Sequence, residues 1–236
     1  LNKIINLYCQ LKKICPELDS INIGGGFPIK HSLGFEYDYQ FIINEIVSNI
    51  KKACKKAKVP MPNIYTEFGS YTVGESMAHI YSVLAEKNQN DRECWYMIDS
   101  SFITTLPDTW GIGEKFLMLP VNKWDNEYHR VVLGGITCDS HDYYDSEEHI
   151  NEVFLPKLKT LDPKDLDSNK EPLYVGFFHT GAYQDQISGY GGIKHCLIPS
   201  PKHVIVERDR NGKLIEWVYA KEQTAQSMLK ILGYLR

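Results

Sequence analysis

Apolar and polar residues alternate with two different periods over the first ninety positions, and these periods predict alternating helices and strands. Apolar side chains at helical spacing predict helices at 1–15, 39–58 and 73–87. Short apolar runs at 18–23 and 63–67, each followed by glycine, predict buried strands. Because two strand–helix units follow one another, we expect parallel strands whose carboxyl ends collect functional groups at one rim.

The remainder of the chain has the pattern of a mostly β domain with a closing helix at 221–235. Short β-branched and aromatic runs, separated by Pro, Gly and Asp, predict strands at 93–98, 130–137, 173–178, 203–208 and 214–219. The sequence DRNG predicts a hairpin between the last two of these strands. The segment 155–172 is rich in Lys, Asp and Pro, which is typical of a surface loop. We therefore divide the chain into an α/β part, 1–90, and a mostly β part, 91–236.

Composition and charge narrow the class of protein. A chain of 236 residues with 43% hydrophobic content can bury a sizeable core. The formal net charge of −4, with one basic run at 51–58 that suits a solvated helix face, predicts no nucleic-acid binding. No window approaches the roughly 18 uninterrupted apolar residues of a membrane-spanning helix, and no signal-peptide pattern is present. Six cysteines without a CxxC pair or zinc-like spacing favour a reducing cytoplasm and no metal site.

Glycine follows each predicted strand of the α/β part. Gly24, Gly25 and Gly26 follow the first strand, where backbone N–H groups can approach an anion without interference from Cβ. Glu67 lies at the end of the second strand, so a parallel arrangement places it on the same rim. Taken alone, the glycines also suit a plain tight turn, and the segment 66–70 suits a helix-capping loop.

The sequence ITCDSHD at 136–142 places a thiol among carboxylates at the end of a predicted strand. Negative neighbours raise the pKa of a thiol and keep it protonated. Cys138 is therefore better suited to donating a proton than to attacking a carbonyl, which disfavours a Cys/His hydrolase. A buried thiol without a chemical role is the other interpretation.

Four motifs in order resemble the fold-type III pyridoxal-phosphate decarboxylases of basic amino acids, the group of ornithine, diaminopimelate and biosynthetic arginine decarboxylases. INIGGGFP resembles their phosphate loop, MPNIYTEFGSYTV their last barrel strand, ITCDSHD their Cys-Asp motif, and GAYQ their phosphate-contacting tyrosine motif. The spans SFITTLPDTWGIGEKFLMLPVNKWDNE and GFFHTGAYQD are most similar to the arginine decarboxylases. The resemblance implies the C-terminal part of a (β/α)8 barrel of the alanine racemase type, over 1–90, followed by a C-terminal β domain.

The resemblance also implies roles for individual residues around pyridoxal 5'-phosphate (PLP). A carboxylate, here Glu67, faces the pyridine nitrogen, and Cys138 returns a proton to Cα after CO2 loss. Two carboxylates, matching Asp139 and Asp108, bind the distal cation of the substrate. From the residues alone, Asp108 also suits a turn or N-cap, and Tyr183 also suits a core position. The residues implied in cofactor binding are Gly24, Gly25, Gly26, Glu67, Gly69, Ser70 and Tyr183.

Two departures from the family pattern shape the expected function. The family's cofactor-binding lysine belongs to an upstream barrel half with no counterpart here, and Ser70 stands where the family usually has an arginine. Since two βα units cannot close an eight-stranded barrel, we expect a C-terminal piece whose missing half is cleaved, disordered or a separate chain. We expect a homodimeric arginine decarboxylase with shared active sites. An ornithine or other diamino acid decarboxylase, and an inactive paralogue that regulates an active enzyme, are the alternatives.

Overall fold

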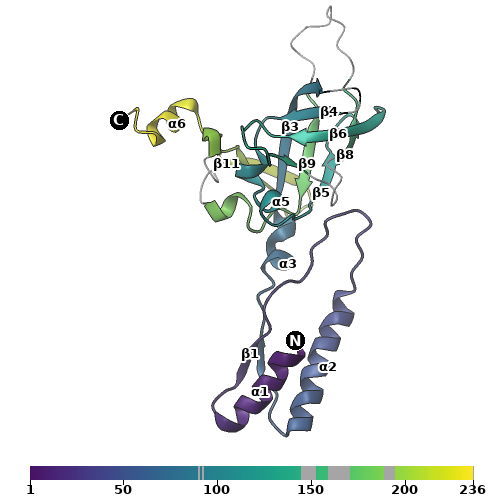
Figure 1. Cartoon of the computed structure of the whole chain (residues 1–236), viewed down its shortest axis with the longest axis vertical. Helices are drawn as coiled ribbons and strands as arrows, with labels where there is room; N and C mark the ends of the chain where they lie inside the picture. Colours follow the sequence, from purple (N-terminus) through teal and green to yellow (C-terminus); the bar gives the residue numbers. More distant parts are fainter. Residues whose placement is uncertain (90, 92, 145–152, 159–170, 189–194, 236) are drawn as a thin grey trace, which may run out of the picture. The chain divides into compact units, whose positions relative to one another are not determined.

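The computed structural model describes residues 1–89, 91, 93–144, 153–158, 171–188 and 195–235. The chain divides into two compact units, Leu1–Glu75 and Ser76–Arg236 (Figure 1). Within the described residues, none of the helices is long and apolar enough to cross a membrane.

The first unit contains two helices and a short parallel strand pair. Its elements are α1 (Asn2–Ile14), β1 (Ser20–Asn22), α2 (Tyr39–Ala57), β2 (Asn63–Tyr65) and α3 (Gly69–Val73), and the 3-10 turn η1 (Gly74–Ser76) leads into the second unit. Ile21 of β1 is paired in parallel with Ile64 of β2, as the alternating pattern predicts. Asp38 caps α2 by accepting a hydrogen bond from the Phe41 N–H at 2.8 Å.

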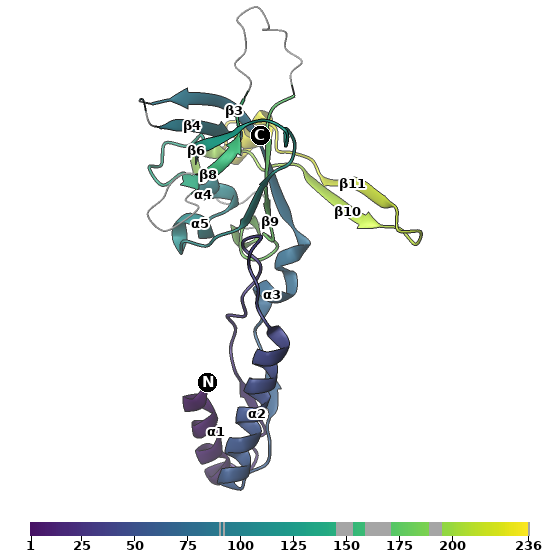
Figure 2. The same cartoon turned by 90° about the vertical axis from the view of Figure 1, so that its right-hand side faces the viewer.

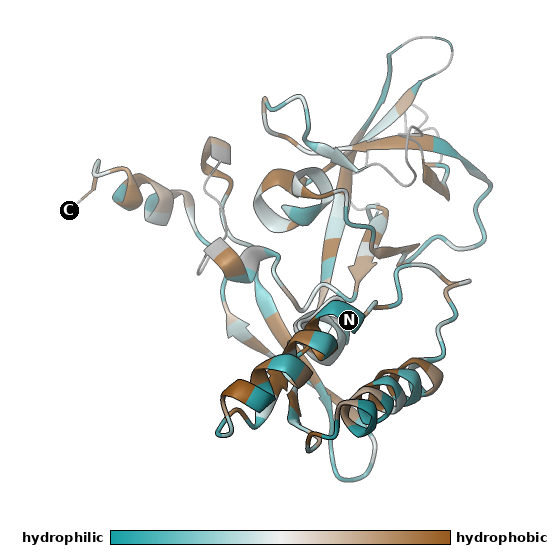
Figure 3. Ribbon diagram, turned by 60° about the horizontal axis from the view of Figure 1, so that its bottom comes forward, coloured by the Kyte–Doolittle hydropathy of each residue, from teal (hydrophilic) through white to brown (hydrophobic). Residues whose placement is uncertain are grey.

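The core of the first unit lies between the two long helices and the strand pair. Both helices carry hydrophobic residues as well as hydrophilic ones, which Figure 3 shows in brown and teal. Their apolar sides meet in one cluster with β1. The fully buried members are Ile5, Tyr8, Cys9, Ile21, Ile50 and Cys54.

The second unit is built on a seven-stranded sheet in the order β5-β9-β3-β4-β6-β7, with β8 also paired to β6 (Figure 2). Two short helices, α4 (Phe102–Thr105) and α5 (Asp108–Gly111), follow β4. Tyr96, Phe102 and Phe177 are among the large side chains that fill the core. The strands are β3 (Ala78–Asn88), β4 (Cys94–Ile98), β5 (Leu117–Pro120), β6 (Tyr128–Gly134), β7 (Tyr143–Tyr144), β8 (Val153–Pro156) and β9 (Tyr174–Phe178).

A separate antiparallel hairpin follows, made by β10 (His203–Arg208) and β11 (Leu214–Ala220). Its turn is the predicted one: the Asp209 N–H donates to the Lys213 carbonyl at 2.8 Å, and Gly212 takes a φ of +79°. The closing helix, α6 (Ala225–Ile231), is shorter than the predicted 221–235, because Thr224 caps its start.

One predicted element is wrong. The expected helix at 73–87 is instead a short helical segment followed by strand β3. His79, Tyr81 and Val83 are buried at every second position, and β3 pairs with β4 on one side and β9 on the other. An apolar run that fits both periods becomes a strand when neighbours satisfy its backbone on both edges. The boundary between the units consequently lies after Glu75, not at residue 90.

The other strand predictions of the β part are confirmed to within a few residues, whereas β5, β7 and β8 were missed because they are short. The predicted loop at 155–172 begins inside β8, at Leu155 and Pro156. Residues 159–170 of that prediction lie outside the described residues.

Candidate active site

The three glycines and Glu67 are joined directly in the first unit. The Glu67 N–H donates to the Gly24 carbonyl at 2.9 Å, which extends the β1–β2 pairing into the loop. Asn22 bridges the same two segments, because its amide donates to Glu67 Oε1 at 2.6 Å and its Oδ1 accepts from the Gly24 N–H at 2.8 Å. The predicted shared rim is therefore present, and Asn22 is a member that the sequence analysis missed.

Each of the three glycines in this loop occupies a position that other residue types do not fit. Gly24 and Gly26 have φ values of +78° and +86°, which L side chains rarely adopt. A Cβ at Gly25 would stand 2.6 Å from the Glu67 carbonyl oxygen, so the close approach of the loop to β2 requires glycine. The sequence GGG thus specifies one backbone path beside the glutamate.

Aromatic rings lie next to the loop. Phe27, which follows Gly26 directly, stacks on Phe68 with ring centroids 4.0 Å apart. Tyr71 of α3 meets Phe27 edge-on at 5.7 Å. The rings pack the residue that follows Glu67 against the glycine loop, and Ser70, the second residue of α3, is half-buried.

These residues fit the phosphate and pyridine of PLP. Among the residues that the structure describes, the N–H groups of Gly25 and Gly26 have no hydrogen-bond acceptor, so they are open to an anion. The Glu67 side chain is exposed, and Asn22 orients one of its oxygens. A carboxylate in this setting can pair with a protonated ring nitrogen.

In the second unit, the turn that carries Cys138 is held by Asp142. This carboxylate is 5% exposed and lies in the same ITCDSHD sequence. Its Oδ1 accepts from the Phe102 N–H of α4 at 2.8 Å, and its Oδ2 accepts from the N–H and hydroxyl of Thr137 at 3.0 and 2.6 Å. A Cβ at Gly135 would stand 2.3 Å from both carboxylate oxygens, so the fit requires glycine there. Of the two acids in the motif, Asp142 is structural.

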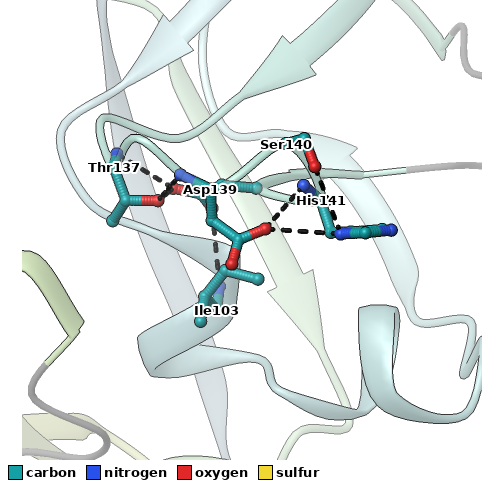
Figure 4. A network of polar contacts seen from close by, with 6 residues as sticks. Ile103, Thr137, Asp139, Ser140 and His141 are labelled. Carbon is teal, nitrogen blue, oxygen red and sulfur yellow. Dashed lines mark hydrogen bonds and ion pairs between the residues drawn. The ribbon is translucent and has the colours of Figure 1, made fainter.

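Asp139 is the acid that remains partly open. Its side chain is 32% exposed, and its Oδ1 accepts from the His141 N–H at 2.8 Å and lies 3.4 Å from His141 Nδ1 (Figure 4). Its own N–H contacts the Thr137 hydroxyl at 3.4 Å. The turn therefore presents a carboxylate at its tip while Asp142 anchors its base.

Cys138 is exposed beside Asp139, and a second thiol lies against it. The sulfur of Cys196, in the 3-10 turn η4 (His195–Leu197), is 3.5 Å from the Cys138 sulfur. The hydrogen bond with Cys196 is the largest cause of a raised pKa at Cys138, and the charge of Asp139 adds to it. The expected protonated thiol is thus supported, but the main cause is a neighbour 58 positions away that the sequence analysis missed.

Asp108 and Tyr183 belong to segments that meet. Gln184, 1% exposed, donates from Nε2 to Asp108 Oδ2 at 3.0 Å and to the Ala182 carbonyl at 3.0 Å. Asp108 is the first residue of α5 and is half-buried. Tyr183 has a φ of +69° and is 55% exposed, so it is not a core residue. The motif GAYQ therefore places its glutamine on the predicted substrate acid and its tyrosine toward solvent.

The predicted site residues thus form two groups, each within one unit. Gly24, Gly25, Gly26, Glu67, Gly69 and Ser70 belong to the first unit. Asp108, Cys138, Asp139 and Tyr183 belong to the second. Within the second unit, α4 links the turn at 136–142 to α5. Asp142 of the turn binds the N-terminus of α4, and α5 follows α4 in the chain.

Solved structures with a similar fold include decarboxylases. The biosynthetic arginine decarboxylase of Campylobacter jejuni matches with a TM-score of 0.78 and 21% identity, over 99% of this chain and 51% of that chain. The diaminopimelate decarboxylase of M. jannaschii, in complex with L-lysine, matches with a TM-score of 0.72 and 20% identity, over 97% and 46% of the two chains. SrLDC, in complex with PLP and cadaverine, matches with a TM-score of 0.55 and 20% identity, over 76% and 41%. The fold is that of the C-terminal portion of the fold-type III PLP decarboxylases.

In sequence, the chain is similar to arginine decarboxylases in particular. The biosynthetic arginine decarboxylase of Marinobacter nauticus is 33% identical over 142 residues, which are 58% of this chain and 20% of that protein. The arginine decarboxylase of Avena sativa is 33% identical over 118 residues, 50% of this chain and 18% of that protein. The matched region is thus about a fifth of these curated relatives and about half of the solved chains. No family model matches the chain.

Proposed function

We propose that this chain is the C-terminal portion of a PLP-dependent decarboxylase that acts on a basic amino acid, with arginine as the leading candidate substrate. The main observation in support is that Asn22 hydrogen-bonds both Glu67 and the glycine loop, in a fold that solved decarboxylases share. The similarity to arginine decarboxylases favours arginine as the substrate and agmatine, a precursor of polyamines, as the product.

The first unit binds and orients the cofactor. The open N–H groups of Gly25 and Gly26 hold the phosphate, with the Ser70 hydroxyl as a further contact. Glu67 keeps a proton on the pyridine nitrogen, and Asn22 fixes the carboxylate that does so. PLP, when bound, supplies the electron sink that stabilises the carbanion left by CO2 loss.

Cys138 supplies the proton that completes the reaction. Its raised pKa keeps the proton on Sγ at neutral pH, where it is available for transfer to Cα of the product. Asp142 acts indirectly, because it holds the turn on which Cys138 stands. A thiol among acids is poorly suited to nucleophilic attack on a carbonyl, which disfavours a hydrolase at this site.

Asp139 and Asp108 bind the distal cation of the substrate. Both carboxylates are half-buried, and each accepts a hydrogen bond that orients it, Asp139 from His141 and Asp108 from Gln184. A guanidinium has two edges that can each meet a carboxylate, and a partly buried cation needs such partners. Ornithine, or another diamino acid as in the diaminopimelate decarboxylases of the same fold, is the second candidate substrate.

The active assembly is a homodimer that also includes the first half of the barrel. The first unit has a two-stranded sheet, which cannot form a closed barrel by itself. The β10–β11 hairpin exposes Val206 and Trp217, and an isolated hairpin is at best marginally stable in water. A second copy of the chain that packs on this hairpin would bury the exposed surface. Trp217→Glu should therefore convert the dimer to a monomer, measured by light scattering, whereas Glu216→Gln should leave the dimer intact.

The decisive experiment combines the chain with the barrel segment that precedes the corresponding region in its relatives. We expect the combined protein to take up PLP, seen as visible absorbance, and to release CO2 from arginine faster than from ornithine, lysine or diaminopimelate. Glu67→Gln should lower the turnover number by at least about 100-fold, while Glu45→Gln on the exposed side of α2 serves as the control. Absence of PLP uptake by the combined wild-type protein would contradict the proposal.

Ser70 motivates one alternative outcome. If the combined protein takes up PLP but releases no CO2 from any of the four amino acids, an inactive paralogue that regulates an active enzyme becomes the better interpretation. Restoring the family arginine with Ser70→Arg should then raise PLP affinity if the serine accounts for a weakened phosphate site.

A further inference from the structure

Cys138 and Cys196 form an exposed pair of thiols. Their sulfur atoms are 3.5 Å apart although 58 positions separate them in the sequence. The other four cysteines are in different settings: Cys9 and Cys54 are buried in the first unit, Cys94 is half-buried, and Cys15 is exposed at the end of α1. An oxidant in solution can therefore reach the pair without unfolding the protein.

The geometry favours a direct bond between the two sulfurs. A disulfide has an S–S length of about 2.0 Å, so the sulfurs need to approach by a further ~1.5 Å, which small side-chain rotations can supply. Asp142 anchors the turn on one side of the pair. On the other side, the Ser200 N–H and carbonyl both bind Gln223, at 3.0 Å each, shortly after Cys196. Both thiols thus stand on segments that the second unit holds in place.

We propose that Cys138 and Cys196 form a reversible disulfide that withdraws the proton donor of the active site. The oxidant is a low-molecular-weight disulfide such as oxidised glutathione. One protein thiolate attacks it, breaking its S–S bond, forming a mixed disulfide and releasing one reduced glutathione. The second protein thiolate then displaces the other glutathione, so two thiol protons and two electrons pass from the protein to two glutathione molecules. The effect on catalysis rests on the proposed function, whereas formation of the bond does not.

The rate of this exchange depends on pH. Because the pKa of Cys138 is raised by its hydrogen bond with Cys196, the thiol is mostly protonated at neutral pH. Only the thiolate attacks a disulfide, so oxidation accelerates as the pH rises. The same thiol that is well suited to donating a proton is therefore slow to oxidise under neutral, reducing conditions.

Peptide mapping tests the bond on the chain as it exists. After incubation with oxidised glutathione and blocking of free thiols, trypsin should yield peptide 131–157 linked to peptide 195–202, lighter than their sum by two hydrogen atoms. Titration in denaturant should find four thiols in place of six, and dithiothreitol should restore six. The Cys15→Ser variant, which removes the other fully exposed thiol, should give the same linked peptide. Absence of this linked peptide, or linkage of Cys138 only to glutathione, overturns the inference.

Activity of the combined protein tests the consequence. Oxidation should reduce arginine decarboxylation by the wild type at least tenfold, and reduction should restore it. The Cys196→Ser variant should be equally active with and without the oxidant. If the linked peptide forms and activity is unchanged, the disulfide stands and the assigned role of Cys138 fails. If activity is lost equally in Cys196→Ser, the loss has another source and the proposed switch is overturned.

Discussion

Substitution of Asp142 by asparagine tests how the turn beneath Cys138 is held. The carboxylate accepts hydrogen bonds from the N–H groups of Phe102 and Ile103, at 2.8 and 3.4 Å, and two more from Thr137, at 3.0 and 2.6 Å. Asparagine has nearly the same shape, so no cavity forms. Its amide nitrogen, however, replaces one oxygen and meets donors instead of supplying an acceptor.

The magnitude follows from the donors left without a partner. One or two buried N–H groups lose their acceptor, at about 1–3 kcal/mol each, and the remaining hydrogen bonds lose their ionic character. Removal of a buried charge offsets part of this loss. We expect the free energy of unfolding of the second unit to fall by roughly 2–4 kcal/mol.

Tryptophan fluorescence during urea unfolding isolates the effect. All four tryptophans of the chain lie after residue 75, so the signal reports on the second unit alone. A lower urea midpoint with an unchanged slope of the unfolding free energy against urea concentration would show that stability is lost while the surface exposed on unfolding stays the same. Asp139→Asn, a partly exposed acid in the same turn, is the control and should cost less than about 1 kcal/mol. Equal losses for the two variants would refute the assignment of Asp142 as the anchor.

Three further predictions concern the glycine loop, acid stability and thiol reactivity. Gly25→Ala should weaken PLP binding by at least tenfold in a fluorescence titration of the combined protein, because its methyl group would stand 2.6 Å from a backbone oxygen; Gly34→Ala, with open space around it, should not. Burial lowers the pKa of His129 below the 6.5 of an unfolded chain, so the unfolded state binds the proton first and stability falls as the pH drops below about 6.5. His129→Gln should flatten the dependence of the urea midpoint on pH in that range, and an unchanged slope would exclude this histidine as the cause. Cys196→Ala should speed the alkylation of Cys138 by iodoacetamide at pH 8, because it removes the main cause of the raised pKa; equal rates, measured by mass spectrometry, would contradict that cause.

The sequence by itself determined the features that depend on near neighbours. Helical spacing in 1–15 and 39–58, and glycine after each short strand, correctly predicted α1, α2 and the parallel pair β1–β2. The turn DRNG predicted its hairpin because its residues act within four positions of one another. Cys138 and its acidic neighbours could be recognised for the same reason.

The tertiary structure decided whatever depends on distant partners. The apolar run containing β3 fits both periods, and only pairing with β4 and β9 made it a strand and moved the boundary to Glu75. The same holds for the contact between Cys138 and Cys196, because no local pattern records which segments meet across 58 positions. Spacing along the chain reports on hydrogen bonds within a turn or helix, whereas sheet neighbours and side-chain clusters form only when the whole unit packs.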